Sequence, residues 1–225
     1  MKYFYLYIFM LCCFILAVSY YNTYTRTSIE SFNSSKQTIV LLGDSILKNN
    51  AYTSNGKSIE ELLQERTKGK TYCFAMDDSK INDVYNQIGN IPENLNNAHT
   101  TIFLSVGGNN ILAKYKENIN ENNTNDLNSI FKSYVHLVQS IQSKMNKTKI
   151  ILLDIYYPND SNYKKYNDLI NEWNEFIYEY AANPKNNIDG VLRISSIIRK
   201  PEDFTQEIEP SNSGGVKIVD AILTF

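Results

Sequence analysis

Four short polar segments of this 225-residue chain carry side chains that are suited to acyl transfer. The hydroxyl of Ser45 can act as a nucleophile. The backbone N–H of Ser45 and the side-chain amide of Asn109 can stabilise an oxyanion, and Gly108 lets the backbone approach a reacting group closely. Taken singly, the segments also have plain structural explanations, since Asp44 and Ser45 fit a helix N-cap and Gly107 to Asn109 fit a tight turn. The four segments are Gly43–Ser45, Ala75–Asp78, Gly107–Asn110 and Gln206–Ser211.

The pattern of apolar residues predicts elements that would bring these segments together. Thr38 to Leu42 is a continuous apolar or β-branched run that ends at Gly43, which is typical of a strand buried on both faces of a parallel sheet. Four more strands are expected, and a helix follows each of the five. This alternation predicts a parallel sheet with helices on both faces, in which the loops after the strands gather at one edge. The further strands are expected over 71–75, 100–106, 149–155 and 191–194, and the helices over 58–68, 79–89, 127–145, 163–182 and 213–223.

Composition and charge exclude several kinds of partner. The net charge of −2 provides no basic surface for nucleic acid. The three cysteines are too few for a disulfide framework, and the two histidines, His99 and His136, lie far apart in the sequence. We therefore expect no metal ion, no cofactor and no nucleic-acid partner.

The N-terminus contains an apolar segment without charge, from Tyr3 to Tyr21. At about 1.5 Å per residue, this segment is just long enough to cross a bilayer as a helix. It is interpreted either as an uncleaved signal anchor, with the domain on the non-cytoplasmic side of the membrane, or as the cleaved signal peptide of a secreted protein, with Ala17–Ser19 as the cleavage site. Its length and its Tyr and Phe content favour the anchor. We expect this segment to span 1–22, a polar linker 23–36, and a single domain 37–225.

In their order and spacing, the polar segments resemble the motifs of the SGNH (GDSL-type) hydrolases, a family of serine esterases, lipases and carbohydrate deacetylases. The resemblance covers residues 37–223 and rests on Gly43–Ser45, on Gly107–Asn110 and on Pro210–Ser211 before the last helix. It implies a three-layer α/β/α flavodoxin-like fold with a five-stranded parallel sheet. It also implies that Ser45 is the nucleophile.

The same resemblance implies further roles around Ser45. Asn109, next to Gly108, would donate to the oxyanion. The family's second motif supplies a glycine as another donor, and Asp78 occupies its place, where the backbone N–H of Asp78 can still serve. Asn110, which stands where the family usually has Asp, and Tyr156 are expected to line the substrate cleft.

The last motif departs from the family, which has Asp-x-x-His there. Gln206 occupies the Asp position and Glu209 the His position. Neither histidine is expected to replace the missing one. A strand separates His99 from the catalytic edge by about 20 Å, and His136 lies in the middle of a helix. Glu209 is therefore the residue left in the position of the base.

Two functions of different class remain open. One is a serine esterase acting on an ester or an acetylated carbohydrate, with Glu209 in the place of the catalytic histidine. A carboxylate with an ordinary pKa of about 4.3 is a weak base near neutrality, so burial or a neighbouring carboxylate, Glu207 or Asp78, would have to raise the pKa of Glu209. The other is a catalytically inactive domain of the same fold, anchored at a membrane, which binds a glycan or a protein.

Overall fold

The structure is a computed structural model that describes residues 37–53, 56–116 and 124–225. Residues 1–36, with the expected anchor or signal peptide and the whole of the expected linker, lie outside the described residues. Thr38 to Phe225 form one compact unit. Within the described part of the chain, no helix is long and apolar enough to cross a membrane.

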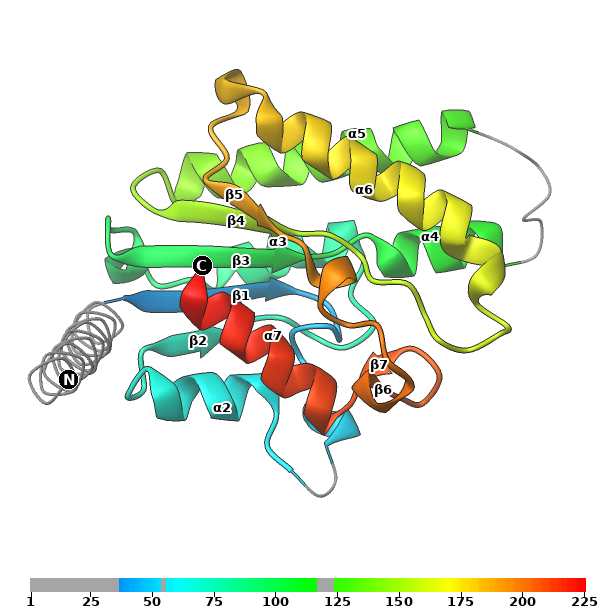
Figure 1. Cartoon of the computed structure of the whole chain (residues 1–225). Coiled ribbons are helices and arrows are strands. Elements are labelled where there is room, and N and C mark those ends of the chain that lie inside the picture. The colour runs from blue at the N-terminus through cyan, green and yellow to red at the C-terminus, as the bar shows by residue number, and fades with distance from the viewer. Residues whose placement is uncertain (1–36, 54–55, 117–123) are drawn as a thin grey trace, which may run out of the picture. The chain divides into compact units, whose positions relative to one another are not determined.

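A sheet of five parallel strands forms the centre of this unit, in the order β2-β1-β3-β4-β5 (Figure 1). The α/β class and the five-stranded parallel sheet predicted from the sequence are thereby confirmed. β2 and β3 lie on opposite sides of β1, so the direction of the strand order reverses at β1, and a ligand crevice is expected outside the carboxyl ends of β1 and β3. The strands are β1 (Thr38–Gly43), β2 (Thr71–Cys73), β3 (Thr100–Ser105), β4 (Lys149–Leu153) and β5 (Gly190–Leu192).

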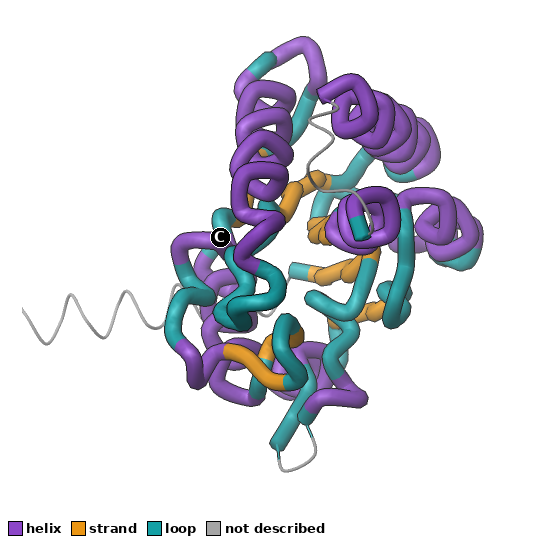
Figure 2. The backbone as a smooth tube through the Cα atoms, turned by 90° about the vertical axis from the view of Figure 1, so that its right-hand side faces the viewer, coloured by secondary structure: helices purple, strands orange, loops and turns teal. Residues whose placement is uncertain are grey.

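Helices cover both faces of the sheet and complete three layers. α2 and α7 pack on one face, and α3, α5 and α6 pack on the other. Figure 2 shows the strands between these two groups of helices. α2 begins with the expected capping box, in which the side chains of Ser58 and Glu61 each accept the other residue's backbone N–H. The helices are α2 (Ile59–Arg66), α3 (Ile81–Gly89), α4 (Gly108–Tyr115), α5 (Thr124–Lys144), α6 (Asn167–Ala182) and α7 (Asn212–Thr224).

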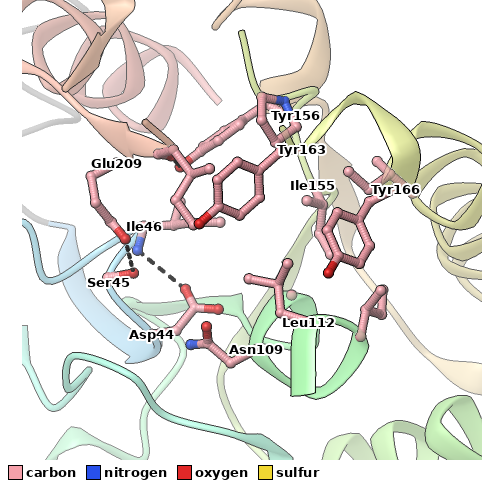
Figure 3. A pocket seen from close by; sticks show the side chains of 15 residues that line it. Asp44, Ser45, Ile46, Asn109, Leu112, Ile155, Tyr156, Tyr163, Tyr166 and Glu209 are labelled. Carbon is pink, nitrogen blue, oxygen red and sulfur yellow. Dashed lines mark hydrogen bonds between the residues drawn. The ribbon is translucent and has the colours of Figure 1, made fainter. Parts of the chain in front are cut away.

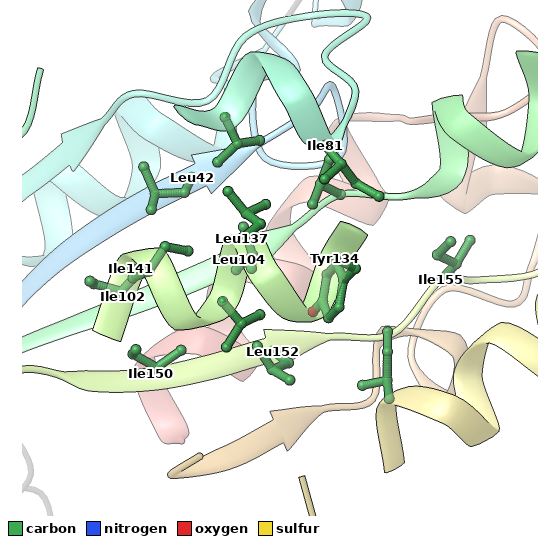
Figure 4. Packing of buried hydrophobic residues seen from close by; sticks show 14 of the residues in the cluster. Leu42, Ile81, Ile102, Leu104, Tyr134, Leu137, Ile141, Ile150, Leu152 and Ile155 are labelled. Carbon is green, nitrogen blue, oxygen red and sulfur yellow. The ribbon is translucent and has the colours of Figure 1, made fainter. Parts of the chain in front are cut away.

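The central strands are apolar on both faces because both faces are covered. Val40, Leu42 and Leu104 pack on the side of α3 and α5, whereas Leu41 and Phe103 pack on the side of α2 and α7. Figure 4 shows Leu42 and Leu104 next to α5. Full burial of one such side chain stabilises a fold by about 1.5–3 kcal/mol. The carboxyl ends of β1 and β3 are therefore fixed positions on which a site can be built.

Two short elements at the carboxyl edge of the sheet differ from expectation. Gly107–Asn110 is expected as a loop or tight turn after the third strand, but α4 begins within it. The residue before α4 is Gly107, which has no capping side chain, so this helix lacks the usual sequence signal of a helix start. The other element is an antiparallel hairpin of β6 (Phe204–Thr205) and β7 (Glu209–Pro210), and strands of two residues are too short to show alternation.

The segment that contains this hairpin begins and ends next to the start of α7. The backbone carbonyl of Asp203 accepts a hydrogen bond from the N–H of Ser211 at 2.9 Å, so the two ends of segment 204–210 meet. The buried side chain of Asp203 accepts two backbone N–H groups that precede it and pairs with Lys217 Nζ at 2.5 Å. These contacts fix the place at which the hairpin leaves the domain.

Candidate active site

The turn after β1 carries Ser45 and depends on Gly43. Gly43 has a φ of 125°, and a Cβ at this position would lie 1.6 Å from the backbone oxygen of Ser105 on β3. A residue with a side chain is therefore excluded. Gln87 of α3 binds the same backbone, since its Oε1 accepts the Gly43 N–H at 2.8 Å and its Nε2 donates to the Gly43 carbonyl at 2.8 Å. The backbone just before the candidate nucleophile is thus held by both β3 and α3.

Ser45 and Glu209 lie together at this edge of the sheet (Figure 3). The hydroxyl of Ser45 donates a hydrogen bond to Glu209 Oε1 at 3.3 Å, and Ser45 is 8 % exposed. A distance of this length is common between a nucleophile and its base before a substrate is bound. The fold therefore brings together two residues that are 164 positions apart in the sequence.

The surroundings of Glu209 make its carboxylate a stronger base than usual. Burial raises the pKa of Glu209 from 4.5 to about 7; the hydrogen bond from Ser45 opposes this rise, and the negative charges of Asp77 and Asp78 add to it. Oε2 of Glu209 is buried, and among the described residues it has no hydrogen-bond partner. A buried carboxylate oxygen without a partner favours the protonated form. Of the neighbouring carboxylates predicted from the sequence, Asp78 contributes to this environment.

Glu209 belongs to the β6–β7 hairpin, whose turn is tight. Two consecutive residues of the turn, Gln206 and Glu207, have φ values of 43° and 74°, in the left-handed region that non-glycine residues rarely adopt. Tyr156 holds this turn, because its buried hydroxyl donates at 2.6 Å to the backbone carbonyl that precedes Glu209. Its ring also packs edge-on against that of Phe204, with 5.4 Å between the ring centroids. Backbone strain of this kind persists where the surrounding contacts enforce it.

The segment after β3 turns directly into α4 and places Asn109 at the pocket. Gly107 has a φ of 125°, and a Cβ there would lie 2.2 Å from the ring of Trp173. Asn109 Nδ2 donates to the backbone carbonyl of Ser79 at 3.1 Å, which leaves its second amide hydrogen for another acceptor. Gly108 is the first residue of α4, and both Gly108 and Asn109 line the pocket.

Ser45 and Glu209 face a pocket that is also lined by side chains of α4 and of the connection from β4 to α6. Figure 3 shows the Ser45–Glu209 pair at one end of the pocket and Leu112, Ile155 and Tyr166 at the other. Tyr156 also lines the pocket, as the sequence predicts.

Comparison with known proteins agrees with this arrangement. A family model described as GDSL-like lipase/acylhydrolase matches residues 39–215. This chain belongs to that family. The resemblance to SGNH (GDSL-type) hydrolases is thereby confirmed, and membership gives the chain a general acylhydrolase function on ester bonds.

Several solved structures share the GDSL-like fold. A lipase from a goat rumen metagenome has a TM-score of 0.64 at 15 % sequence identity, with 84 % of this chain and 96 % of that chain covered. A G-D-S-L family protein from Veillonella parvula gives 0.62 at 20 % identity, with 84 % and 97 % covered. Phospholipase A1 from Streptomyces albidoflavus gives 0.61 at 13 % identity, with 84 % and 99 % covered. At these identities the similarity establishes the fold alone. No curated protein matches the sequence significantly.

Two residues expected in the GDSL-like site lie outside the pocket. The N–H of Asp78 donates to Asp77 Oδ1 at 3.0 Å and is therefore not free for an oxyanion in this conformation. Asn110 Oδ1 accepts the N–H of Ile81 at 3.0 Å, so Asn110 connects α4 to the start of α3 instead of lining the cleft. The helical start at Gly108 explains the second difference, because successive helical residues point in different directions.

The described histidines lie away from Ser45. His99 and His136 are exposed, and neither lines the pocket. His99 precedes β3 and so lies at the opposite end of that strand from Gly107. Neither His99 nor His136 thus lies where it could contact Ser45 in this structure. In residues 37–53, 56–116 and 124–225 no three His, Cys, Asp or Glu side chains group in a way that could hold a metal ion.

Gln87 supports the site but is not singled out by the sequence motifs. Besides binding Gly43, its Nε2 donates to Ser79 Oγ at 3.1 Å, and the backbone carbonyl of Ser79 accepts from Asn109. Gln87 thus connects the strand end before Ser45 to the segment that holds Asn109. A sequence signal exists, since Gln87 is a polar residue next to Ile88 on the apolar face of α3.

Asp44 is a second buried carboxyl group beside Ser45. Its Oδ1 accepts the hydroxyl of Ser105 at 3.1 Å and the N–H of Ile46 at 3.2 Å. Burial raises the pKa of Asp44 to about 7; these two hydrogen bonds oppose the rise, and the charge of Glu209 adds to it. Asp44 therefore stabilises the turn after β1, in line with the capping role that the sequence also allows.

Proposed function

We propose that this protein is a serine esterase in which Ser45 is the nucleophile and Glu209 takes the place of the catalytic histidine. The observation that supports this proposal is the hydrogen bond from Ser45 Oγ to Glu209 Oε1. The substrates are esters of small molecules or acetylated carbohydrates.

The ionised carboxylate of Glu209 accepts the hydroxyl proton of Ser45 while Oγ attacks the carbonyl carbon of the ester. The tetrahedral intermediate collapses as its bond to the alcohol oxygen breaks, and Glu209 returns the proton to that oxygen. An acyl group then remains on Ser45. Water attacks the acyl-enzyme and gives a proton to Glu209, the bond to Oγ breaks, and Oγ takes the proton back.

The oxyanion of each tetrahedral intermediate is stabilised by the N–H of Ser45 and by the free amide hydrogen of Asn109. Gly108, without a side chain at the start of α4, keeps this position open.

The alternative is an inactive domain that binds a glycan or a protein, and it is favoured by Gln206 and Glu209 standing where the family has Asp and His. A fluorophosphonate probe distinguishes the two. We expect the probe to label Ser45 covalently, and Ser45→Ala to lose both labelling and hydrolysis of 4-nitrophenyl butanoate. A folded wild-type protein that is neither labelled nor active would favour the inactive domain.

We further propose that residues 1–22 anchor the domain at a membrane, on its non-cytoplasmic side. The uncharged stretch from Tyr3 to Tyr21 supports this proposal. Mass spectrometry of the protein from its native membrane fraction is the test. The full-length mass is expected, and loss of about two kilodaltons would instead indicate a cleaved signal peptide and a secreted protein.

A further inference from the structure

The pocket at Ser45 has two chemically different ends. Asp44, Asn109 and Glu209 give polar groups to the end near Ser45. The wall beyond them is built by α4, by the connection from β4 to α6, and by α6 itself, and none of its side chains is charged. The residues of this wall that matter here are Ile111, Leu112, Ile155, Tyr163, Tyr166 and Ile170.

The position of Glu209 decides which part of an ester lies against this wall. The alcohol oxygen must lie near Glu209, since Glu209 gives it a proton when it leaves. The carbonyl oxygen must lie near Asn109, which stabilises the negative charge. The remaining substituent of the reacting carbon is the acyl chain, and the space left for it is toward Leu112 and Tyr166, at the end opposite the Ser45–Glu209 pair in Figure 3.

We propose that this apolar wall is an acyl-chain site, that the enzyme prefers esters of linear saturated acids longer than acetate, and that Leu112 limits the chain. This proposal rests on the proposed roles of Ser45 and Glu209. An acetyl group would leave most of the wall uncovered. A sugar placed against it would lose hydrogen bonds to water without replacing them. Acetylated carbohydrates are therefore the poorer of the two substrate classes.

A second depression adjoins the acyl-chain site and shares Leu112, Tyr163 and Tyr166 with it, but Lys116, Lys165 and Glu207 also line this depression. An alkyl chain that passed Leu112 would meet these charged side chains, so the depression does not extend the acyl-chain site. The gain in kcat/KM with chain length is thus expected to end once the chain reaches Leu112.

The first test compares 4-nitrophenyl acetate, butanoate, hexanoate and octanoate. Each methylene buried against the wall is expected to raise kcat/KM by about fourfold, the equivalent of about 0.8 kcal/mol per methylene. From acetate to butanoate, two methylenes give a rise of about 15-fold. A kcat/KM that is equal for all four esters, or highest for acetate, would overturn the proposal while leaving the esterase function intact.

The variant Leu112→Trp fills the proposed chain site from α4. It is expected to lose the preference for hexanoate over acetate, so that the ratio of the two kcat/KM values falls toward one. The matched control is Lys114→Trp, which places the same ring on the same helix at a residue paired with Asp126 of α5 at 3.1 Å. This control is expected to retain the wild-type preference. Equal chain-length profiles for the two variants would refute the role of Leu112.

Binding without chemistry separates this proposal from the proposed function. Calorimetry of Ser45→Ala with methyl butanoate and methyl hexanoate is expected to show affinity about 15-fold higher for hexanoate and a negative heat-capacity change. If Ser45→Ala binds hexanoate in this way while the wild type hydrolyses no ester, the acyl-chain site stands and the esterase function fails. If hexanoate binds no better than butanoate, the acyl-chain site is refuted whatever the activity.

Discussion

The pH dependence of hydrolysis depends on the environment of Glu209. The base must be ionised to accept the proton of Ser45, and burial raises the pKa of Glu209 from 4.5 to about 7. Activity should therefore increase as the pH rises through about 7 and decrease below it. For a pKa of about 7, the ionised fraction at pH 8 exceeds that at pH 5 by about 90-fold. For an ordinary glutamate, the same two fractions would differ by less than about twofold.

The assay is kcat/KM for 4-nitrophenyl butanoate from pH 5 to pH 8, followed at the isosbestic wavelength of nitrophenol. The background at each pH is taken from Ser45→Ala, and circular dichroism at each pH checks that the protein remains folded. The expected profile has one ionisation near pH 7 and about 90-fold lower kcat/KM at pH 5 than at pH 8. A profile that is flat from pH 5 upward would refute the role of burial in setting this base.

Glu209→Gln is the matched variant, because its amide keeps an acceptor for the Ser45 hydroxyl but cannot take a proton. We expect kcat/KM at pH 8 to fall by a factor of about 100 or more, the usual range for loss of a general base. The ionisation near pH 7 should disappear from the remaining activity. A Glu209→Gln enzyme with wild-type kcat/KM would remove Glu209 from the mechanism.

Three other expectations concern the parts that support the site. The pKa of Asp44 is raised from 3.8 to about 7 in the folded state, so stability present at low pH is lost as the pH rises through about 7. Urea unfolding should therefore show Asp44→Asn more stable than the wild type at pH 8 by up to about 4 kcal/mol. An equal pH dependence of the free energy of unfolding for both proteins would contradict this. Tyr156→Phe removes the hydrogen bond to the carbonyl before Glu209 and should lower the free energy of unfolding by about 1–3 kcal/mol. In the same variant, kcat should fall by a larger factor than KM rises. An unchanged kcat would show that Tyr156 does not position the base. Gly43→Ala should cost more than about 4 kcal/mol or prevent folding, whereas the control Gly89→Ala, which meets no atom within 4 Å, should be tolerated in the same unfolding assay.

The sheet could be predicted from the sequence because it depends on a strong and local signal. Each buried strand is a short run of apolar residues, as in Thr38 to Leu42, and the five runs alternate with helical patterns. Parallel strands place their carboxyl ends at one edge, so the meeting of Ser45 after β1 and Asn109 after β3 follows from the fold class.

The elements that orient the site side chains could not be predicted in the same way. α4 begins at Gly108 without a capping side chain, and this start points Asn110 toward α3. The β6–β7 hairpin is held by Tyr156, which is far from it in the sequence. The N–H of Asp78 is bound by its own neighbour, Asp77. Such features depend on contacts between distant segments or on single backbone angles, which a pattern of residue types does not contain.

The hydrogen bond between Ser211 and Asp203 closes segment 204–210 into a loop before the chain enters α7. Closing so short a loop costs little conformational entropy, and longer versions cost only slightly more. The residues inside the loop are therefore free to change without altering how the strands of the main sheet pair. Under this constraint, the residue that faces Ser45 is a replaceable part of the scaffold. The side chain at position 209 can therefore differ while the rest of the domain keeps its shape.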